Sequence, residues 1–332
     1  MDNFDVIDQT REIVAISDDL DRSIGIVVCI PSFRRPQHLR LTLDSLADQH
    51  TDRRFAVVIV ENDSEKCEGV AVAQDVLAGG RVAGLCLIEP RQGNCYAINA
   101  AFETALATFD AASYFLMIDD DEIAAPDWLE RMVAAAERTR ADLIGGPVKP
   151  HFDDAGKRSL RRHPAFRPAY DVSGPVLMIY GCGNCLITRR VFDTLSDPVF
   201  DLRFNFLGGG DTDFFMRCRK AGMTFHWEEH ALVTETVPNS RTRPCWLALR
   251  ALRIGAINYR IEAKTARTLA SRARLLAKIL LLFPLSIWRG IRLVGTEHRA
   301  LIALHPLLVA AGGALAALGI EPQPYKASKM KS

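Results

Sequence analysis

Two clusters of aspartates are the side chains best suited to chemistry in this 332-residue chain. The first, Asp119-Asp120-Asp121, directly follows the apolar run Tyr114–Ile118. Adjacent carboxylates repel one another and lose hydration on burial, so a divalent cation is a natural partner for them. Ions such as Mg²⁺ bind one or two carboxylates and complete their shell with phosphate oxygens and water. Strand alternation predicts that Asp119 and Asp121 share a side and that Asp120 faces the other way. The alternative is an acidic turn ahead of a helix.

The second cluster, Asp211 and Asp213, follows Gly208-Gly209-Gly210 and opens a helix-like segment with bases near its end. Asp211 is either a helix N-cap, typically worth about 1 kcal/mol, or a carboxylate with a chemical task. Three glycines exceed the needs of a simple turn, because they permit positive φ and let a ligand approach the backbone. We expect both clusters to meet at one edge of a sheet.

The elements that would position these clusters alternate between strand and helix. The runs Ile24–Ile30, Phe55–Val60, Gly84–Ile88 and Tyr114–Ile118 are short and nearly uninterrupted, as strands buried on both faces are. Helical spacing follows Pro36, covers Asn94–Ala107 and begins again at Pro126. This order predicts a right-handed, largely parallel sheet covered by helices, with its ligands at the carboxyl ends of the strands.

Two common nucleotide-binding signatures are missing after the first predicted strand. No GxGxxG segment follows it, and the chain holds no GxxxxGK[ST] segment, which argues against a dinucleotide cofactor and a phosphate-cradling loop. Eight cysteines without regular spacing indicate reduced thiols in a cytosolic setting. For the close pair Cys182 and Cys185 we expect packed thiols, the alternative being a redox or zinc site.

Five segments of the chain resemble glycosyltransferase family 2, whose members have the GT-A fold. In order along residues 24–245 they are IVVCIPSFRRPQHLRLTLDSL, FAVVIVENDS, QGNCYAINAA, FLMIDDDEIAAPDWLE and GGGDTDFFMRCRKAG. Within the family, VENDSE, IDDDE, DTDFF and TETVP are most similar to bacterial glucosyltransferases that build succinoglycan-type exopolysaccharides. The resemblance implies a Rossmann-like, mainly parallel sheet with flanking helices over residues 23–245. Residues 1–22 would be an N-terminal extension and residues 246–332 a basic and apolar helical appendage.

The resemblance also implies a donor site for a nucleotide sugar, with a uridine diphosphate sugar favoured. Glu61 matches the acid that reads the base, and Asp119 and Asp121 match the acids of the DxD motif. The implied nucleotide-binding residues are Pro31, Ser32, Arg34, Glu61, Asp63, Asn99 and Asp119. The implied ligands of Mg²⁺ or Mn²⁺ are Asp119, Asp121 and Glu235, which replaces a histidine common in relatives.

In the family, an aspartate at the place of Asp211 is the general base, and we take Asp213 as the fallback. One base with one in-line attack gives inversion at the anomeric carbon. Gly210 stands where relatives carry a glutamate, and Ile98 replaces an arginine, so some contacts must come from elsewhere. The further candidates for diphosphate or acceptor contacts are Gly183, Asn184, Gly210, Arg241, Arg243 and Trp246. A loop without function is the alternative for the glycine-asparagine segment, as is a solvated surface for the arginines.

Charge divides the chain into an acidic body and a basic tail. Residues 241–299 hold thirteen Lys or Arg and two Glu, whereas residues 1–240 carry 25 basic and 37 acidic side chains. The uncharged stretch Ala300–Ile320 is long enough to span a bilayer. The stretch Leu275–Val294 is also strongly apolar, although Lys278, Pro284, Arg289 and Arg292 interrupt it. Interruptions and basic flanks favour a re-entrant or interfacial pair of apolar segments on an anionic membrane surface, with a soluble helical appendage as the alternative. The interruptions and flanks are His305-Pro306, Gly312-Gly313, Arg299, Lys326, Lys329 and Lys331.

The resemblance implies an inverting transfer of glucose from UDP-glucose to a saccharide acceptor, and it implies a polyprenyl-diphosphate-linked acceptor, which a surface anchor in the tail would suit. The enzyme would work at the cytoplasmic face of the bacterial inner membrane. Nucleic acid is not an expected partner, because no aromatic residues are interleaved with the basic face. Two alternatives stay open: a nucleotidyltransferase that makes sugar nucleotides, and a non-catalytic sugar-nucleotide-binding scaffold at a membrane.

Overall fold

The structure, a computed structural model, describes residues 11–18, 20–195, 199–266, 268–293 and 299–320. The chain forms two compact units. The first comprises Met1–Lys149, Pro168–Asn205 and Gly210–Glu235, and the second comprises Pro150–Arg167, Phe206–Gly209 and Thr236–Ser332. This division differs from the expected boundary after residue 245, because the second unit starts at Thr236 and takes in two segments from the middle of the chain.

The first unit is built on a nine-stranded sheet with the order β1-β4-β3-β2-β5-β10-β7-β11-β9. The four predicted strands are β2, β3, β4 and β5, and they pair in parallel. β10 runs antiparallel to β5, with Asn184 opposite Ile118, so β10 begins at the edge where β5 ends. The strand bounds are β1 (Glu12–Ile16), β2 (Ile26–Ser32), β3 (Ala56–Glu61), β4 (Ala83–Ile88), β5 (Tyr114–Ile118), β7 (Leu143–Gly145), β9 (Gly174–Val176), β10 (Asn184–Thr188) and β11 (Phe225–Trp227).

The N-terminal strand β1 corrects one expectation. Residues 1–22 were predicted to be an extension outside the fold, yet Glu12–Ile16 pairs antiparallel with β4 and forms an edge of the sheet. Its sequence EIVAI is too short to stand out from the acidic surroundings. Residues 1–10, which belong to the same prediction, lie outside the described residues.

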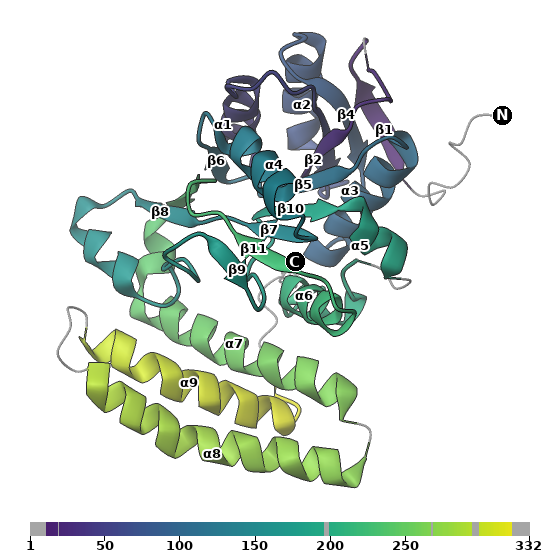
Figure 1. The fold of residues 1–332 in the computed structure, drawn as a ribbon. Helices are drawn as coiled ribbons and strands as arrows, with labels where there is room; N and C mark the ends of the chain where they lie inside the picture. Colours follow the sequence, from purple (N-terminus) through teal and green to yellow (C-terminus); the bar gives the residue numbers. More distant parts are fainter. Residues whose placement is uncertain (1–10, 19, 196–198, 267, 294–298, 321–332) are drawn as a thin grey trace. The chain divides into compact units, whose positions relative to one another are not determined.

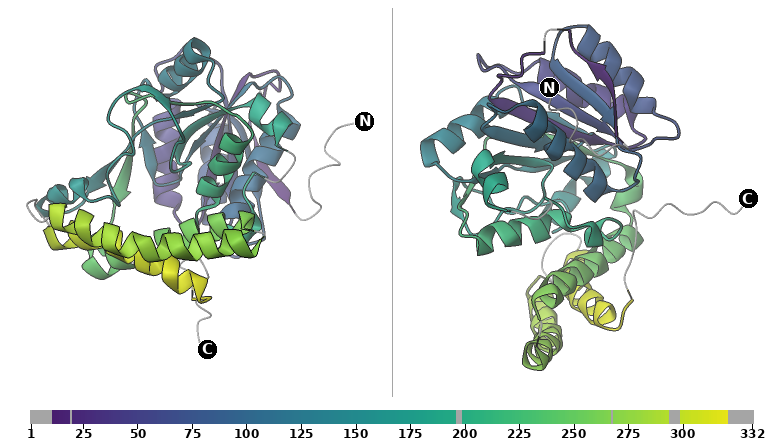
Figure 2. Two further views of the ribbon diagram at one scale, coloured as in Figure 1. Left: turned by 60° about the horizontal axis from the view of Figure 1, so that its bottom comes forward. Right: turned by 90° about the vertical axis from the view of Figure 1, so that its right-hand side faces the viewer.

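Helices cover both faces of the sheet, which explains why its central strands are apolar without interruption (Figure 2). α1 (Pro36–Ala47), α2 (Glu68–Ala78) and α4 (Trp128–Thr139) contribute to one core with the alternate strand residues Val28 and Ile30. α3 (Asn94–Thr108) packs on the opposite face of β2 and β3. The remaining elements of this unit are α5 (Arg189–Thr194), η3 (Leu202–Phe204), α6 (Gly210–Lys220) and β6 (Glu122–Ala124), which pairs antiparallel with β12 (Val233–Val237).

The second unit is mainly helical. Its long helices are α7 (Pro244–Thr265), α8 (Leu269–Leu293) and α9 (Arg299–Ala317), and α9 lies between the other two (Figure 1). A side chain at Gly255 would meet the Val309 carbonyl, and one at Gly312 would meet the Leu252 carbonyl, so α7 and α9 touch backbone to backbone. The short helices η2 (Ala155–Arg162) and η4 (Asn239–Thr242) complete this unit, and β8 (Val148–Phe152) leads the chain into it.

The tail was expected to contain an apolar segment at Ala300–Ile320 that is long enough to span a bilayer. Within the described residues, no helix combines the length and the apolar character that crossing a membrane requires. The basic flank formed by Lys326, Lys329 and Lys331 lies outside the described residues.

Candidate active site

The aspartate triplet lies in the turn between β5 and β6, at the carboxyl edge of the parallel strands. The Asp120 carboxylate accepts hydrogen bonds from the Ser32 hydroxyl, at 3.0 Å, and from the Phe33 N–H, at 3.1 Å. Arg35 binds both Asp120, at 3.0 Å, and Asp121, at 2.6 Å. The strand ends at Ile118, so alternation does not continue through the triplet, and the expectation that Asp120 faces away from Asp121 is wrong.

Asp119 is surrounded by other acids. Burial, followed by the charges of Asp121, Asp120 and Glu235, raises the pKa of Asp119 to about 8. Glu122 accepts the Asp119 N–H at 3.0 Å, and its own pKa is raised well above the usual range, first by burial and then by Asp119. Glu235 pairs with Glu122 across β12 and β6, which brings a carboxylate from a distant part of the chain to the turn.

This set of oxygen ligands fits a hard divalent cation, which would relieve the mutual repulsion of the acids. Among the described residues, no three or more His, Cys, Asp or Glu side chains are grouped closely enough to hold a metal ion unaided. A cation that takes one or two protein carboxylates and fills its shell with phosphate and water does not need such a cage. The side chains present are therefore compatible with a cation that arrives together with a diphosphate.

The loop after β3 holds the predicted base-reading residues. Both Glu61 oxygens accept backbone N–H groups, from Asp63 at 2.8 Å and from Gly69 at 2.7 Å, and Glu61 is only 1% exposed. Arg34 donates two hydrogen bonds to the Asp63 carboxylate, at 2.7 and 3.2 Å, and these lower the pKa of the Asp63 carboxyl. Arg34 adopts a left-handed backbone conformation (φ 56°), which is uncommon for a residue other than glycine.

These contacts separate two tasks within the loop. Glu61 stabilises the conformation of the loop, because both of its oxygens accept hydrogen bonds from the backbone. A contact between Glu61 and the base of a nucleotide stays a prediction. Arg34 is exposed and held in place by Asp63. Pro31 and Ser32 are buried at the end of β2, and the Ser32 hydroxyl orients Asp120. Direct contacts of Pro31 and Ser32 with a nucleotide are likewise predictions.

Three asparagines hold the beginning of α3. Asn62 accepts the Gly93 N–H at 2.8 Å, and Asn205 accepts the Cys95 N–H at 3.0 Å. Asn99 donates to the Phe200 carbonyl and accepts the Phe200 N–H, at 2.8 and 2.7 Å. The amide of Asn99 is thus used on both sides by the backbone, so its predicted role in nucleotide binding is not supported.

The two aspartates of α6 lie in different surroundings. Asp213 is 2% exposed and pairs with Arg217 at 3.0 Å, one helical turn further along. Asp211 is half-buried, and one of its oxygens accepts the Thr212 N–H at 2.7 Å. The ion pair with Arg217 fixes the Asp213 side chain against its own helix. Asp211 as the base, with Asp213 as the fallback, stays a prediction.

The packing around Gly210 explains why this chain has a glycine where relatives carry a glutamate. A Cβ at this position would lie 2.7 Å from the Phe200 ring and 3.1 Å from the Cys95 sulfur. The Phe200 ring and the Cys95 thiol occupy the space into which a longer side chain would extend. The glutamate that relatives carry here would not fit without moving the segment that Asn99 holds.

Asp119 and Asp211 both contribute to the electrostatic environment of one pair of buried thiols, and the expected meeting of the two acidic clusters stays a prediction. Cys182 and Cys185 precede and begin β10, next to the end of β5. Burial raises the pKa of both thiols, and the charges of Asp211 and Asp119 each raise the two pKa values further. All eight cysteines of the chain belong to the described residues and are unpaired with one another; Cys182 and Cys185 are buried, as packed thiols are, whereas Cys245 is exposed.

Gly183 and Asn184 were predicted to line the acceptor side. A Cβ at Gly183 would lie 2.8 Å from an Asp119 oxygen and 2.7 Å from a Glu122 oxygen, so Gly183 makes room for the acids. Asn184 is buried: it accepts the Trp128 indole N–H at 2.8 Å and donates to the Pro147 and Ala231 carbonyls, at 3.0 and 2.8 Å. A role of Asn184 in acceptor binding is therefore not supported, because its amide joins three separate segments of the fold.

Three further candidates, Arg241, Arg243 and Trp246, belong to the second unit. Arg241 lies in η4, and Arg243 immediately precedes α7. The Trp246 ring stacks on Phe166 with an interplanar angle of 9°, and the Arg250 guanidinium lies 5.4 Å from its centre. Trp246 therefore has a packing role within its unit, and contacts of the two arginines with a diphosphate stay predictions.

Sequence reasoning missed Arg35 and Glu122. Both stand inside quoted motifs, but their roles depend on partners that the sequence does not reveal. Arg35 joins the loop after β2 to the acid turn after β5, and Glu122 adds a buried carboxylate to Asp119. A second arginine beside Arg34, and a fourth acid after three aspartates, were the available signals.

The comparisons with known proteins agree with this arrangement. Residues 27–196 match the model of glycosyl transferase family 2, and residues 114–314 match glycosyl transferase family group 2. The succinoglycan biosynthesis protein ExoM of Rhizobium meliloti is 32% identical over 74% of this chain and 77% of its own length. The O-antigen biosynthesis protein RfbC of Myxococcus xanthus is 25% identical over 69% of this chain, which spans 19% of that protein.

Solved structures share the fold at low sequence identity. The mannosyltransferase PcManGT of Pyrobaculum calidifontis, in complex with GDP-Man and Mn²⁺, has a TM-score of 0.60 at 15% identity and covers 92% of this chain and 91% of its own. S. aureus TarS has a TM-score of 0.52 at 15% identity, covering 88% of this chain, which spans about half (53%) of the TarS chain. The sheet order, the acid turn and the matched family models lead to one conclusion: this chain belongs to glycosyltransferase family 2 and has a GT-A fold.

Proposed function

We propose that the chain transfers a sugar, with inversion, from a uridine diphosphate sugar to a saccharide acceptor, and that the reaction depends on Mg²⁺ or Mn²⁺. The observation that carries the proposal is the carboxylate cluster of the acid turn, where burial and neighbouring acids raise the pKa of Asp119 to about 8 and a Cβ at Gly183 would lie 2.8 Å from an Asp119 oxygen. This cluster is suited to a cation, and Asp211, in the first turn of α6, is the proposed proton acceptor. Transfer of a sugar needs both a charge-stabilised leaving group and a proton acceptor.

On the donor side, the residues of the acid turn would hold the diphosphate through a shared cation. Asp119 and Asp121 would be its ligands, with Glu235 as a further candidate. When bound, the cation would stabilise the charge that develops on the departing diphosphate, so that no protonating acid is needed there. Arg35 already holds Asp121 and Asp120, and Arg34 is presented by Asp63 toward the same edge of the sheet. Arginine forks pair well with phosphate oxygens, which supports a role for both in donor binding.

On the acceptor side, Asp211 would take the proton from the attacking hydroxyl. A positioned carboxylate base typically contributes about 10²–10⁴ in rate. A single attack opposite the leaving diphosphate inverts the anomeric centre, so an α-linked donor gives a β-linked product. Asp213 and Arg217 would hold the first turn of α6 in place beneath this base.

The donor sugar and the acceptor are proposed from relatives. ExoM is a succinoglycan biosynthesis protein, which supports a role in exopolysaccharide synthesis. Glucose from UDP-glucose is the donor that we propose on the resemblance to succinoglycan-type glucosyltransferases. Solved relatives bind UDP-GlcNAc and GDP-Man, which supports a nucleotide-sugar donor in general. A polyprenyl-diphosphate-linked acceptor at the cytoplasmic face of the bacterial inner membrane would suit the basic helical tail.

A donor-hydrolysis screen tests the proposal. The full chain is incubated with UDP-glucose, UDP-GlcNAc, UDP-galactose and GDP-mannose, each with Mn²⁺, with Mg²⁺ and with a chelator, and release of the nucleoside diphosphate is followed. We expect turnover of one uridine donor that requires metal and is lost in Asp121→Ala. Equal turnover with the chelator would refute the metal dependence. Binding of a donor without any turnover would favour the non-catalytic scaffold.

A further inference from the structure

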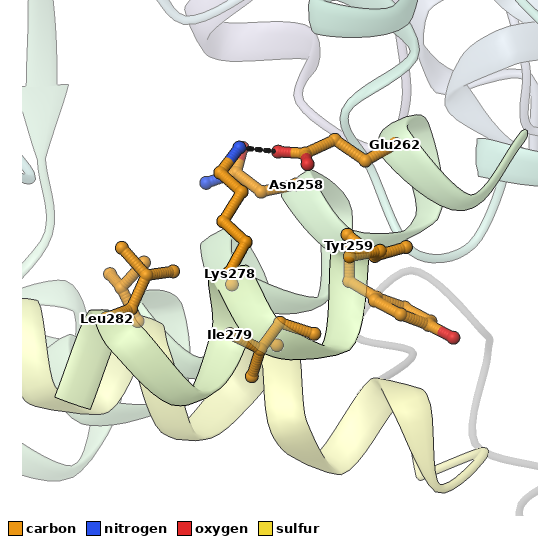
Figure 3. A pocket seen from close by; sticks show the side chains of 10 residues that line it. Asn258, Tyr259, Glu262, Lys278, Ile279 and Leu282 are labelled. Carbon is orange, nitrogen blue, oxygen red and sulfur yellow. Dashed lines mark hydrogen bonds and ion pairs between the residues drawn. The ribbon is translucent and has the colours of Figure 1, made fainter. Parts of the chain in front are cut away.

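The helix α8 presents two different apolar faces. One face packs inward: Leu275 and Ile279 are buried and line a pocket with Gly255 and Val309 of the neighbouring helices. Lys278 reaches from α8 to Glu262 on α7 and forms an ion pair at the rim of this pocket (Figure 3). The ion pair and the packing together determine which side of α8 turns toward its neighbours.

The other face of α8 is apolar and exposed. Leu276, Leu280, Ile287 and Ile291 follow one another at intervals of four, seven and four residues, which places them on one side of a helix. Leu280 is 69% exposed and Ile291 66% exposed, and Leu281 and Trp288 continue the surface. Soluble proteins rarely leave a contiguous apolar surface of this kind open unless it meets a partner or a membrane.

Charge distinguishes between possible partners. α8 contains five Lys or Arg and no Asp or Glu. Arg274 and Arg289 are exposed and lie beside the apolar face at helical spacing. An apolar face with tryptophan, bordered by arginines, is the pattern of a helix that lies in the interface of a bilayer with anionic headgroups. Two copies joined through this face would bring like charges together without an acid on α8 to offset them.

We infer that the exposed face of α8, formed by Leu276, Leu280, Leu281, Ile287, Trp288 and Ile291, docks the protein on a bilayer containing anionic lipids. This assigns the membrane contact, which was expected of the apolar tail as a whole, to α8. α9 is the inner helix, since its Gly312 touches the α7 backbone and its Ala310 and Ala316 are buried. The inference rests on the proposed function and extends it, because a lipid-linked acceptor would be presented at a membrane surface.

Vesicle binding by the full chain tests the inference. The protein is sedimented with vesicles of phosphatidylcholine alone and with vesicles that also contain phosphatidylglycerol. We expect binding to the mixed vesicles that weakens at high salt, and a loss of at least tenfold in the partition coefficient for Leu280→Glu combined with Ile287→Glu. Arg274→Gln and Arg289→Gln should each weaken binding to the mixed vesicles about fivefold.

The matched control is Leu41→Glu, which places the same charge at an exposed leucine on α1 (49% exposed) and should bind as the wild type does. An equal loss of vesicle binding in this control would overturn the inference. Wild-type protein that does not bind the mixed vesicles would also overturn it. A wild-type dimer in vesicle-free buffer that Leu280→Glu/Ile287→Glu converts to a monomer would assign the face to a second copy instead. Donor hydrolysis in vesicle-free buffer should be unchanged in every α8 variant. Failure of donor hydrolysis in the wild type would therefore count against the proposed function and not against the docking surface.

Discussion

At the scale of single residues, the site is a set of carboxylates whose neighbours decide what each can do. Asp120 is bound by Ser32, Phe33 and Arg35, and Asp213 is bound by Arg217. Asp119 is instead crowded by acids, which raises its pKa to about 8 without a cation. We propose that Asp119 and Asp121 interact with the donor through a cation and that Asp211 interacts with the acceptor.

The pairing of Asp213 with Arg217 leads to a prediction about stability. Asp213→Asn removes the buried charge and leaves Arg217 without its carboxylate, so we expect the free energy of unfolding to fall by about 2 kcal/mol or more. Urea unfolding measures this change. The matched control is Asp127→Asn, because Asp127 and Arg131 form an ion pair of the same spacing at the surface. The control should change stability by less than about 0.5 kcal/mol. Equal effects of the two substitutions would contradict the structural role of Asp213.

The residue types in the acid turn were predictable from the sequence, and their division of labour was not. Three aspartates after an apolar run are a local signal, visible without the fold. Asn99 and Asn184 were misassigned because their partners, Phe200 in one case and Trp128 in the other, are remote in sequence. An asparagine that joins backbone segments and one that binds a ligand look the same until the fold is known.

At the scale of elements, buried parallel strands were the most predictable part of the molecule. β2, β3, β4 and β5 each begin and end within two residues of their apolar runs, since no polar residue interrupts a strand covered on both faces. The strands β7 and β11 gave no such signal because they have three residues each, and β1 gave none because its five residues are not buried on both faces. Their pairing depends on tertiary contacts instead.

The edge strand β1 supplies a prediction about pH. Burial raises the pKa of Glu89, but hydrogen bonds from Arg91 and Arg11 outweigh it and leave the pKa below the ordinary 4.5. Arg11 directly precedes β1, so the ionised Glu89 ties this strand to the end of β4. A lowered pKa in the folded state contributes stability above pH 4.5 that is lost as the pH falls through the folded-state value.

Glu89→Gln should therefore be less stable than the wild type at pH 7, and the difference should shrink as the pH falls below about 4.5. Urea unfolding of both proteins between neutral and acidic pH measures it. Glu103→Gln is the control, because Glu103 binds Arg11 from an exposed position. A difference between Glu89→Gln and wild type that stays constant across this range would show that the ionised form of Glu89 is not what stabilises the fold.

At the scale of the whole molecule, the chain combines a GT-A unit with a basic helical unit. The acidic body and basic tail were evident from charge counts, and family 2 membership followed from five motifs in order. The boundary between the units was not predictable, because the helical unit also takes in Pro150–Arg167 and Phe206–Gly209 from within the catalytic sequence. The docking face of α8 became visible only once the packing of α9 was known.

The central claim is that Asp121 is needed to bind the donor through a cation, whereas Asp211 is needed only for its turnover. The most direct test compares Asp211→Asn and Asp121→Ala with the wild type in two measurements: calorimetric binding of the uridine donor in the presence of Mn²⁺, and its turnover. Our account predicts that Asp211→Asn binds the donor as the wild type does but turns it over about 10²–10⁴ times more slowly, while Asp121→Ala loses both. Turnover by Asp211→Asn at the wild-type rate would contradict the account.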